Sequence, residues 1–460
     1  MQVVTREHSK KLRLKYIATD FVCLVATWFI VNFIRHNFFG VYTTPTDIMY
    51  WVFLVLFLLG WMGLYAIAGC YNHPHHHSRM SDLITSLTTS AIGCVILLFV
   101  MILNDTVNTY SDYIETFFVL FIVQFILSFI PRVLITNNTM RCFDRYEIFF
   151  PTLIIGEGKN GQTVKEAIEN HHSNGMYVEG MVETKNGVDL DNLQIILKEK
   201  KIKNVIIAPD EGKMQMVSRL MPILFENGVN IFLSADTYDI AIGGMSALDI
   251  FSIPLISLSR QRMPQWQRNV KWMIDKVLAL FAIIFLSPVL LYSAYKIKKG
   301  SPGPIIFKQT RIGLKGHPFK IYKFRSMYVS NEQNNSVHLT KEDDPRIAGK
   351  WGHTMRKYRI DELPQFFNVL KGDMSMVGFR PEQPYYVRQL IDRDPHYAML
   401  YCMRPGITSW GMVKYGYAEN IDEMIRRAKY DYLYVDNGSL AVDVKIAFYT
   451  VKTIVTGKGK

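Results

Sequence analysis

The stretch RIDELPQFFNVLKGDMSMVGFRP, residues 359–381, places two adjacent acids directly before an apolar run. It carries the signals of a short helix, because Asp361 suits the N-cap while Glu362 and Pro364 suit the first turn. Gly372 suits the position just after the last turn. The free N–H groups and the positive dipole end of a helix start also favour an ionised acid and bind phosphate. We therefore predict that the acidic pair begins a helix and handles a phosphate group at the same place.

The two acids also suit phosphoryl-transfer chemistry. An aspartate kept in its anionic form can attack phosphorus, as in enzymes that form an aspartyl phosphate. Its neighbour Glu362 can bind Mg²⁺, which usually takes one or two carboxylates together with substrate phosphate oxygens. Basic side chains near the pair would neutralise the phosphates. These are Lys323, Arg325, Arg356, Arg359 and Arg380.

The composition indicates a membrane protein. Of the 460 residues, 49% are hydrophobic and only 20% are charged, which is too apolar for an ordinary soluble protein. The formal net charge of +12 suits either nucleic acid or an anionic membrane surface. Most of the basic residues flank apolar segments, so we predict a membrane and no nucleic acid as partner. The five cysteines show no paired spacing, so neither disulfides nor a zinc site is expected.

Four long apolar stretches fill the first third of the chain, and each approaches the roughly 20 residues that a helix needs to cross a bilayer. They are Tyr16–Ile34, Met49–Ala68, Leu83–Leu103 and Tyr113–Ile130. Basic residues precede the first stretch and follow the fourth, whereas the loop 104–112 has no Lys or Arg. The positive-inside rule then places both ends of this bundle in the cytoplasm. We predict that residues 1–145 form four transmembrane helices.

Residues 146–260 have the pattern of a Rossmann-like α/β domain. A short apolar strand leads into Gly156, Gly158 and Gly161, and further short strands alternate with helical stretches. Such a glycine loop can bring the backbone close to a pyrophosphate, and Glu179 or Glu183 would then hold a ribose. The alternative is a glycine-rich turn in a domain that binds no nucleotide. We favour that alternative slightly, because nothing else in this part of the chain is catalytic.

The uncharged segment 277–295 is long enough to be a fifth transmembrane helix. Proline at position 288, next to Ser287, removes a backbone hydrogen bond near its middle, and both flanks of the segment are basic. A helix broken there can enter one leaflet and return to the same face, provided that the freed carbonyls find partners, one of which Ser287 can supply. We predict a re-entrant membrane helix over about residues 270–297, with a kinked spanning helix as the alternative.

Several motifs together resemble a known family. FKIYKFRSM, DPRI, DELPQFFNVLKGDMSMVGFRPE and MRPGITSWG are similar to sequences of the bacterial polyprenyl-phosphate hexose-1-phosphate transferases. These are monotopic phosphoglycosyl transferases, which start capsule, O-antigen or exopolysaccharide repeat units. The resemblance of the catalytic region covers residues 265–460, and four membrane helices with a Rossmann-like domain match the family's long form. The resemblance implies a monotopic α/β catalytic domain with a re-entrant helix broken at Ser287 and Pro288.

The resemblance also implies a two-step reaction. Asp361 would attack the sugar-bearing phosphorus of a UDP-hexose such as UDP-glucose or UDP-galactose, release UMP and form a covalent sugar-phosphate enzyme. Undecaprenyl phosphate would then accept the sugar phosphate, while Glu362 would bind Mg²⁺. This chemistry requires the bacterial inner membrane, with the catalytic domain on its cytoplasmic face. We also expect a homodimer.

Other site residues follow from the resemblance alone. Lys323 and Arg325 match the family's lysine-phenylalanine-arginine stretch, and Arg380 matches the arginine of its proline-arginine-proline motif. The first proline of that motif is replaced by Phe379, so we expect looser geometry at Arg380. Arg404, Pro405 and Gly406 match a loop that we assign to the nucleotide end of the substrate. Asp443 lies in SLAVDVKI, a stretch similar to the family's, and would support substrate binding; the alternative is a polar position on an amphipathic helix.

Two other functional classes stay open. A membrane-bound NAD-dependent dehydratase or epimerase would use the glycine loop, but its Tyr/Lys pair occurs only as Tyr292 and Lys296, inside an apolar segment. A non-enzymatic scaffold of polysaccharide assembly is the second alternative, and it would release no UMP from a UDP-sugar.

Overall fold

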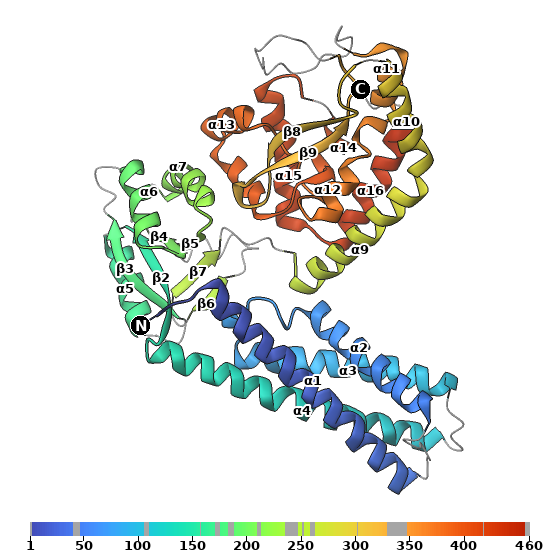
Figure 1. The fold of residues 1–460 in the computed structure, drawn as a ribbon. Helices are drawn as coiled ribbons and strands as arrows, with labels where there is room; N and C mark the ends of the chain where they lie inside the picture. Colours follow the sequence, from blue (N-terminus) through green and yellow to red (C-terminus); the bar gives the residue numbers. More distant parts are fainter. Residues whose placement is uncertain are drawn as a thin grey trace. The chain divides into compact units, whose positions relative to one another are not determined.

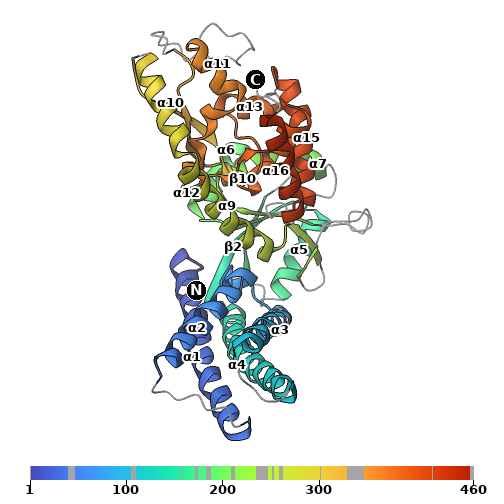
Figure 2. The same cartoon turned by 90° about the vertical axis from the view of Figure 1, so that its right-hand side faces the viewer.

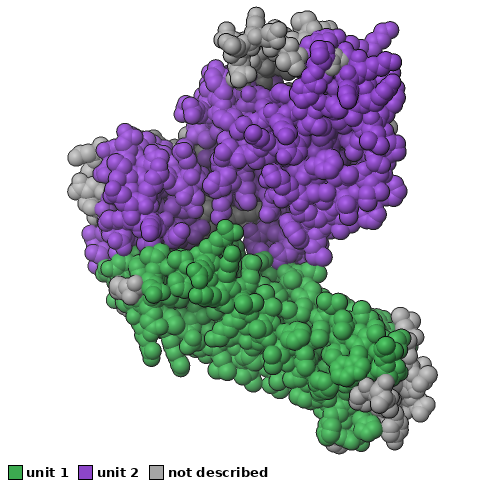
Figure 3. Space-filling view, viewed as in Figure 1, with its two compact units in different colours: residues 1–150, 168–177 green, residues 151–167, 178–460 purple. Residues whose placement is uncertain are grey.

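The computed structural model describes residues 2–455 except 40–46, 105–109, 157, 171–174, 183–187, 209–212, 235–246, 251–252, 258–262, 301, 329–346 and 417. It divides into two compact units, residues 1–150 with 168–177 and residues 151–167 with 178–460 (Figure 3). Each unit is described on its own. The predicted three-part division at 1–145, 146–260 and 265–460 stays a prediction.

Four long helices make up most of the first unit (Figure 1). They are α1 (Arg6–Phe39), α2 (Ile48–Ala68), α3 (Arg79–Asn104) and α4 (Tyr110–Asp144). Each has the length and apolar composition of a membrane span, which confirms the four predicted apolar helices. A short turn, η1 (Pro74–His76), lies between α2 and α3, and β1 (Gln2–Val3) pairs in parallel with the start of β2 (Ile148–Ile155).

The interior of the helix bundle combines aromatic packing with an ion pair. Trp61 and Tyr65 are buried there, whereas apolar side chains such as Phe33 and Leu59 are exposed on the outside, as expected for a lipid-facing surface. Arg132 donates to both carboxylate oxygens of the buried Asp20, from Nε to Oδ1 at 3.0 Å and from Nη2 to Oδ2 at 2.7 Å. An intramembrane charge normally faces the bundle interior and finds a partner, as here.

The second unit begins with an α/β region. Its helices are α5 (Lys159–Asn170), α6 (Leu190–Glu199) and α7 (Lys213–Glu226), and its strands after β2 are β3 (Met176–Val182), β4 (Asn204–Ile207), β5 (Asn230–Ser234), β6 (Ala247–Ile250) and β7 (Ile253–Ser257). The strands β2, β4 and β5 are parallel, and β7 and β6 continue the sheet in antiparallel pairings. The predicted α/β alternation is therefore confirmed.

The strand order differs from the Rossmann-like prediction. The first strand of the domain, β2, lies between β3 and β4, the second and third strands in the chain. This is the flavodoxin type of doubly wound order, whereas the dinucleotide-binding order places the second strand between the first and the third. Alternating strands and helices do not determine which strands pair, so the sequence pattern could not distinguish the two orders.

The glycine loop after β2 has a packing reason for at least one of its glycines. A Cβ on Gly161 would lie 1.8 Å from the carbonyl oxygen of Gly156, so only glycine fits there. Glu179 lies within β3, whose residue Val182 pairs with Gly156, so Glu179 is not at the carboxyl end of its strand. Glu183 lies outside the described residues. The predicted contact of Glu179 or Glu183 with a ribose therefore gains no support from the structure.

The catalytic region starts with a broken helix, α9 (Gln265–Phe285) followed by α10 (Ser287–Gly300), which Figure 2 shows along one side of this region. The two helices are bent by 61°, a geometry that fits either a broken span or a re-entrant loop. Pro288 has no N–H to donate to the carbonyl of Ile284, and the Ser287 hydroxyl donates to that carbonyl instead, at 2.7 Å. The helix is thus interrupted beside Ser287 and Pro288, and the Ser287 hydroxyl supplies a partner for a freed carbonyl. The re-entrant path through the membrane stays a prediction.

The remaining elements pack into a small α/β body. The hairpin strands β8 (Ile306–Ile312) and β9 (Pro318–Phe324) are antiparallel, and β10 (Ser375–Val377) pairs in parallel with β11 (Gly406–Thr408). The helices and turns are η3 (Leu314–Gly316), α11 (Gly349–Lys357), η4 (Ile360–Glu362), α12 (Gln365–Lys371), α13 (Pro384–Arg393), η5 (Pro395–Cys402), α14 (Trp410–Lys414), α15 (Ile421–Asn437) and α16 (Leu440–Val455).

Candidate active site

The acidic pair lies in the turn η4, between α11 and α12. Arg359 enters this turn with a left-handed backbone (φ 58°), which is uncommon for a residue other than glycine. The helix α12 ends as predicted at Gly372, which adopts the left-handed conformation (φ 97°).

The predicted N-cap role of Asp361 is wrong. The helix α12 starts at Gln365, its N-cap is Pro364, and no side chain caps it. Because Pro364 has no N–H, the carbonyl of Ile360 accepts instead from Leu363, at 3.2 Å, and the chain makes a tight three-residue turn before the helix. Asp361 is consequently not engaged with the backbone of α12.

Glu362 is buried at the centre of a cluster of cations. Its Oε1 lies 2.8 Å from Lys323 Nζ and 3.9 Å from Arg380 Nη2, and its Oε2 lies 3.1 Å from Arg359 Nη1. Burial raises the pKa of a carboxyl group, but the neighbouring cations outweigh it and hold the pKa of Glu362 well below its usual range. Burial also lowers the pKa of the Lys323 ammonium group, although Glu362 opposes that shift. Glu362 is therefore an ionised acid in an otherwise positive environment.

Asp361 is in the opposite situation. Its Oδ1 is buried and has no hydrogen-bond partner within the part of the chain that the structure describes. Burial, together with the adjacent charge of Glu362, raises the pKa of Asp361 to about 6. An unpaired carboxylate oxygen with this pKa is ionised at neutral pH and available for nucleophilic attack.

A second buried carboxylate, Glu382, supports Arg380. Glu382 accepts from Arg427 Nη2 at 2.7 Å and from Arg311 Nη1 at 3.1 Å, and Arg380 Nε lies 3.9 Å away. Burial raises the pKa of Glu382, but Arg427 and the other two arginines outweigh it, so the pKa is lowered. Arg380 therefore lies between two ionised glutamates, with one end near Glu362 and the other near Glu382.

Phe379, which replaces the first proline of the motif, is held by packing, and the expectation of looser geometry at Arg380 stays a prediction. Phe379 is fully buried and packs edge-to-face on Tyr401, with ring centroids 5.5 Å apart. Its carbonyl accepts from Gly406 N at 2.9 Å. Packing of the phenyl ring thus fixes the segment that a proline ring would otherwise stiffen.

Comparison with known proteins identifies the catalytic region. The family model described as bacterial sugar transferase matches residues 266–457. A protein of Caulobacter vibrioides named UDP-glucose:undecaprenyl-phosphate glucose-1-phosphate transferase is 39% identical over 188 residues, which cover 40% of this chain and 70% of that protein. This chain belongs to the bacterial sugar transferase family.

Two further relatives of this chain carry related names. The UDP-N-acetylgalactosamine-undecaprenyl-phosphate N-acetylgalactosaminephosphotransferase of Aeromonas hydrophila is 45% identical over 190 residues, 41% of this chain and 44% of that protein. The UDP-glucose:undecaprenyl-phosphate glucose-1-phosphate transferase of Escherichia coli is 33% identical over 308 residues, 65% of this chain and 66% of that protein. The matched parts thus cover less than two thirds of these two relatives.

Two other predicted site residues have contacts or effects of their own. Arg325 is buried and donates from Nη1 to the carbonyl of Pro302 at 2.5 Å, so it fastens the end of β9 to the segment after α10. Arg356, in α11, is half-buried, and its charge partly offsets the rise in the pKa of Asp361 that burial causes. Glu362 itself is in contact with Lys323, Arg359 and Arg380.

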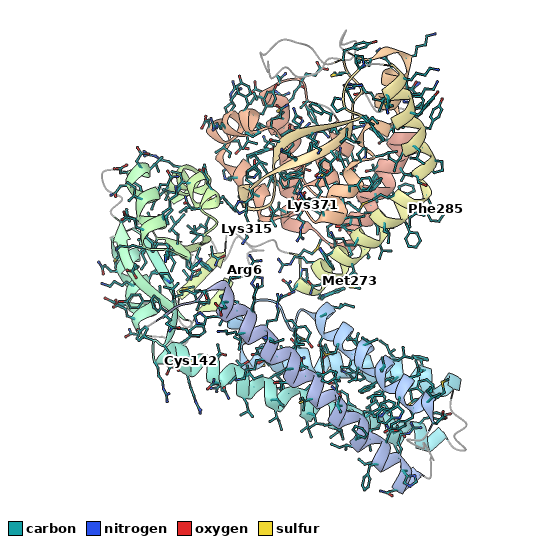
Figure 4. All side chains as sticks on the ribbon, viewed as in Figure 1. Arg6, Cys142, Met273, Phe285, Lys315 and Lys371 are labelled. Carbon is teal, nitrogen blue, oxygen red and sulfur yellow. The ribbon has the colours of Figure 1, made fainter. Side chains whose placement is uncertain are left out.

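Arg404 lies at the other end of α12. Its Nε donates to the carbonyl of Gly372 at 3.1 Å. Lys276 of α9 donates to the carbonyls of Val369, at 2.6 Å, and Leu370. Figure 4 labels Lys371 beside this end of the helix. Both cations therefore satisfy carbonyls at the C-terminus of α12, where the helix dipole favours positive charge.

The other residues predicted from the resemblance have structural contacts. Pro405 and Gly406 run beside the strand that leads to Arg380, and a Cβ on Gly406 would lie 2.1 Å from Gly378 N. Asp443, on α16, pairs with Lys271 of α9 at 2.7 Å. Their substrate-binding roles stay predictions.

Two kinds of supporting residue could not be recognised as a group from the sequence. Glu382 and Arg427 are 45 positions apart, and no local pattern connects them. Asn368 is fully buried in α12 and brackets β9, accepting from Tyr322 N at 2.9 Å and donating to the carbonyl of Lys320 at 2.8 Å. Asn368 is a polar residue within the apolar run of α12, and such a residue needs hydrogen-bond partners when it is buried. This was the signal in the sequence that could have identified it.

Proposed function

We propose that this protein transfers a sugar 1-phosphate from a UDP-sugar to undecaprenyl phosphate and releases UMP. The observation that carries the proposal is the contrast between the two adjacent acids. Glu362 is held by three cations, whereas the buried Oδ1 of Asp361 has no partner among the described residues. The names of the relatives support the two substrate classes.

In the first step, a lone pair of Asp361 Oδ1 attacks the phosphorus attached to the sugar. A new O–P bond forms, and the bond from that phosphorus to the bridging oxygen breaks, so UMP leaves with the bonding electrons. In the second step, an oxygen of undecaprenyl phosphate attacks the same phosphorus and the Asp361 carboxylate leaves. Lys323, Arg359 and Arg380 stabilise the negative charge on the phosphoryl oxygens in both steps.

Mg²⁺ is the proposed cofactor. In the described part of the chain no three His, Cys, Asp or Glu side chains form a metal cluster, so an ion bound by protein ligands alone is not favoured. The two acids and the four cations around them carry a net charge of +2; the cations are Lys323, Arg356, Arg359 and Arg380. This positive charge opposes the binding of Mg²⁺ until the diphosphate group of the UDP-sugar arrives. Glu362 together with phosphate oxygens of the donor then fits the ion, which neutralises phosphate charge when bound.

The membrane placement belongs to the same proposal. The donor is soluble in the cytosol and the phosphate of the acceptor is tethered at the bilayer surface, so the reaction requires an active site at the cytoplasmic face of the inner membrane. A re-entrant α9–α10 hairpin, with its 61° bend and basic flanks, returns the chain to that face. We further propose a hexose as the sugar, the first membrane step of capsule, exopolysaccharide or O-antigen synthesis as the role, and a homodimer as the assembly.

The test is a screen of UMP release over UDP-sugars, with Mg²⁺ and undecaprenyl phosphate, on the native chain and on Asp361→Asn. Asp361→Asn should abolish turnover and the sugar-phosphate adduct, which intact-protein mass spectrometry detects when the acceptor is left out. Asp422→Asn, an exposed aspartate on α15, is the matched control and should keep both. Turnover by Asp361→Asn would contradict the nucleophile, and a native chain that releases no UMP would favour a scaffold.

A further inference from the structure

A small cavity lies beside the first turns of α9, at the membrane-entry side of the catalytic region. Figure 4 labels Met273, which lies in the same part of α9. The cavity is bounded by α9, β10, the segment before β11 and α15. Six of its lining residues matter here: Arg268, Lys271, Trp272, Asp275, Ser375 and Arg404.

The cavity is separate from the acidic pair. Val377, at the end of β10, lines the cavity, whereas Arg380 comes three residues later and reaches Glu362. At roughly 3.3 Å per residue of extended chain, the backbones of these two residues are up to about 10 Å apart. Arg404 reaches the cavity from the C-terminal end of α12, and the acidic pair precedes its N-terminal end.

The charges around the cavity favour an anion. Both nearby carboxylates are engaged, since Asp443 accepts from Lys271 at 2.7 Å and Asp275 accepts from the Ser375 hydroxyl at 2.5 Å. Arg268, Lys271 and Arg404 line the cavity together with one acid, Asp275, while Asp443 lies outside the lining and pairs with Lys271. Arg268 also donates from Nη2 to Gln265 Oε1, so it adds positive charge with part of its guanidinium group engaged. Arg404 uses only its Nε, and its terminal nitrogens have no partner among the residues that the structure describes. Guanidinium groups with free terminal nitrogens bind phosphate oxygens in a bidentate manner.

The size of the cavity selects a small group. Its volume is about 70 Å³. One buried water needs about 10–15 Å³ on this measure, so the cavity accommodates roughly five non-hydrogen atoms. A phosphate group has this size, whereas a nucleoside is much larger. The rest of a larger ligand would therefore lie outside the cavity.

The position on α9 indicates the source of the phosphate. Trp272 lines the cavity and is also about half exposed, with the Lys276 ammonium group 5.6 Å from its ring centroid. The neighbouring side chains of α9 are exposed and apolar, as a lipid-facing surface requires: Met273, Ile274, Val277, Leu278, Leu280 and Phe281. Tryptophan beside lysine and arginine is typical of the level of lipid head groups.

We infer that this cavity is a binding site for the phosphate group of an anionic membrane lipid. Arg268 and Arg404 hold the phosphate oxygens, and Trp272 packs beside the glycerol backbone. The site is distinct from the place where the sugar phosphate is transferred, and its occupation does not depend on the proposed reaction.

The test uses the full chain in an uncharged maltoside detergent, titrated calorimetrically with dihexanoyl phosphatidylglycerol and, separately, with inorganic phosphate. The lipid should bind at least about tenfold more tightly than phosphate, because only the lipid contacts Trp272. Arg268→Gln and Arg404→Gln should each weaken lipid binding by about tenfold, the loss of one charge-assisted hydrogen bond. Lys299→Gln, which removes a cation of α10 outside the cavity, should change it by less than about twofold.

Two variants keep the test decisive. Arg404→Gln also removes a contact to α12, so Arg268→Gln carries the conclusion if the former variant does not fold. Arg404→Lys, which retains the charge but not the forked geometry, should recover part of the affinity. Equal lipid binding by the native chain and Arg268→Gln would overturn the site. Equal affinities for phosphate and lipid would overturn the assignment to a membrane lipid.

Discussion

Two buried acid–base clusters in this protein, one in the helix bundle and one in the catalytic region, differ in how completely their charges are matched. In the bundle, Asp20 and Arg132 form a bidentate pair that satisfies both carboxylate oxygens. In the catalytic region, Glu362 has three cations around it, whereas the adjacent Asp361 retains a buried oxygen without a partner among the described residues. A matched pair stabilises a structure, and an unmatched pair leaves a group available for chemistry.

Glu362→Gln should give the largest effect that tests this contrast. The substitution keeps the shape of the side chain but removes the negative charge that positions three cations. Without that charge the cations should no longer stay in the positions from which they contact the phosphate oxygens. We expect turnover to fall about 10³-fold, or roughly 4 kcal/mol of transition-state stabilisation. The measurement is UMP release, with the exposed Glu199→Gln as control. A loss below tenfold would show that Glu362 is a structural partner only.

Asp20→Asn should have a large effect on the stability of the protein and little effect on turnover. It leaves the guanidinium group of Arg132 buried without its counter-charge, which costs about 3 kcal/mol or more in the free energy of unfolding. Denaturant unfolding in detergent should detect this loss. Turnover of the folded fraction should stay close to that of the native chain. A selective loss of turnover without destabilisation would remove the distinction between the two clusters.

The pH dependence of UMP release should show the titration of Asp361. Its pKa is raised to about 6, so the Asp361 carboxylate is mostly ionised at neutral pH, fully ionised only at higher pH, and lost as the pH falls through 6. Below this midpoint the rate of the initial UMP burst should fall about tenfold per pH unit if Asp361 is the nucleophile. Burial also raises the pKa of Asp431 to about 6, so Asp431→Asn is the control and should retain the midpoint. If the midpoint disappears in Asp431→Asn, the titration belongs to Asp431 and not to Asp361.

Asn368→Leu should have the smallest effect of the four. It removes the two hydrogen bonds that fix α12 to β9, the strand that carries Lys323. We expect kcat to fall about fivefold, roughly 1 kcal/mol, while KM for the UDP-sugar changes little. A rise in KM with unchanged kcat would instead indicate that Asn368 supports donor binding rather than the position of Lys323.

The features that follow from local chemistry could be predicted from the sequence. The stop at Gly372 and the break at Pro288 depend on the backbone preferences of single residues, and the structure has both. The four apolar helices depend on composition and length, which are also local properties.

The features that depend on tertiary contacts could not be predicted in the same way. The order of β3, β2 and β4 is set by packing, not by the alternation of strands and helices. The contact of Arg404 with the carbonyl of Gly372, at the C-terminus of α12, joins two positions that no local pattern connects, and the predicted substrate-binding role of Arg404 stays a prediction. The expected N-cap failed because Pro364 removed one N–H and tightened the turn.

The contact between Lys276 and the carbonyls of Val369 and Leu370 links α9 directly to the helix that follows the acidic pair. Between that contact and Asp361 lie α12, a helix of seven residues, and the tight turn before it. If Asp361 is the nucleophile and α9 enters the bilayer, as proposed, a shift of α9 along the membrane normal should move this turn. We therefore expect UMP release to vary with bilayer thickness and with the choice of detergent, as it would with temperature or ionic strength.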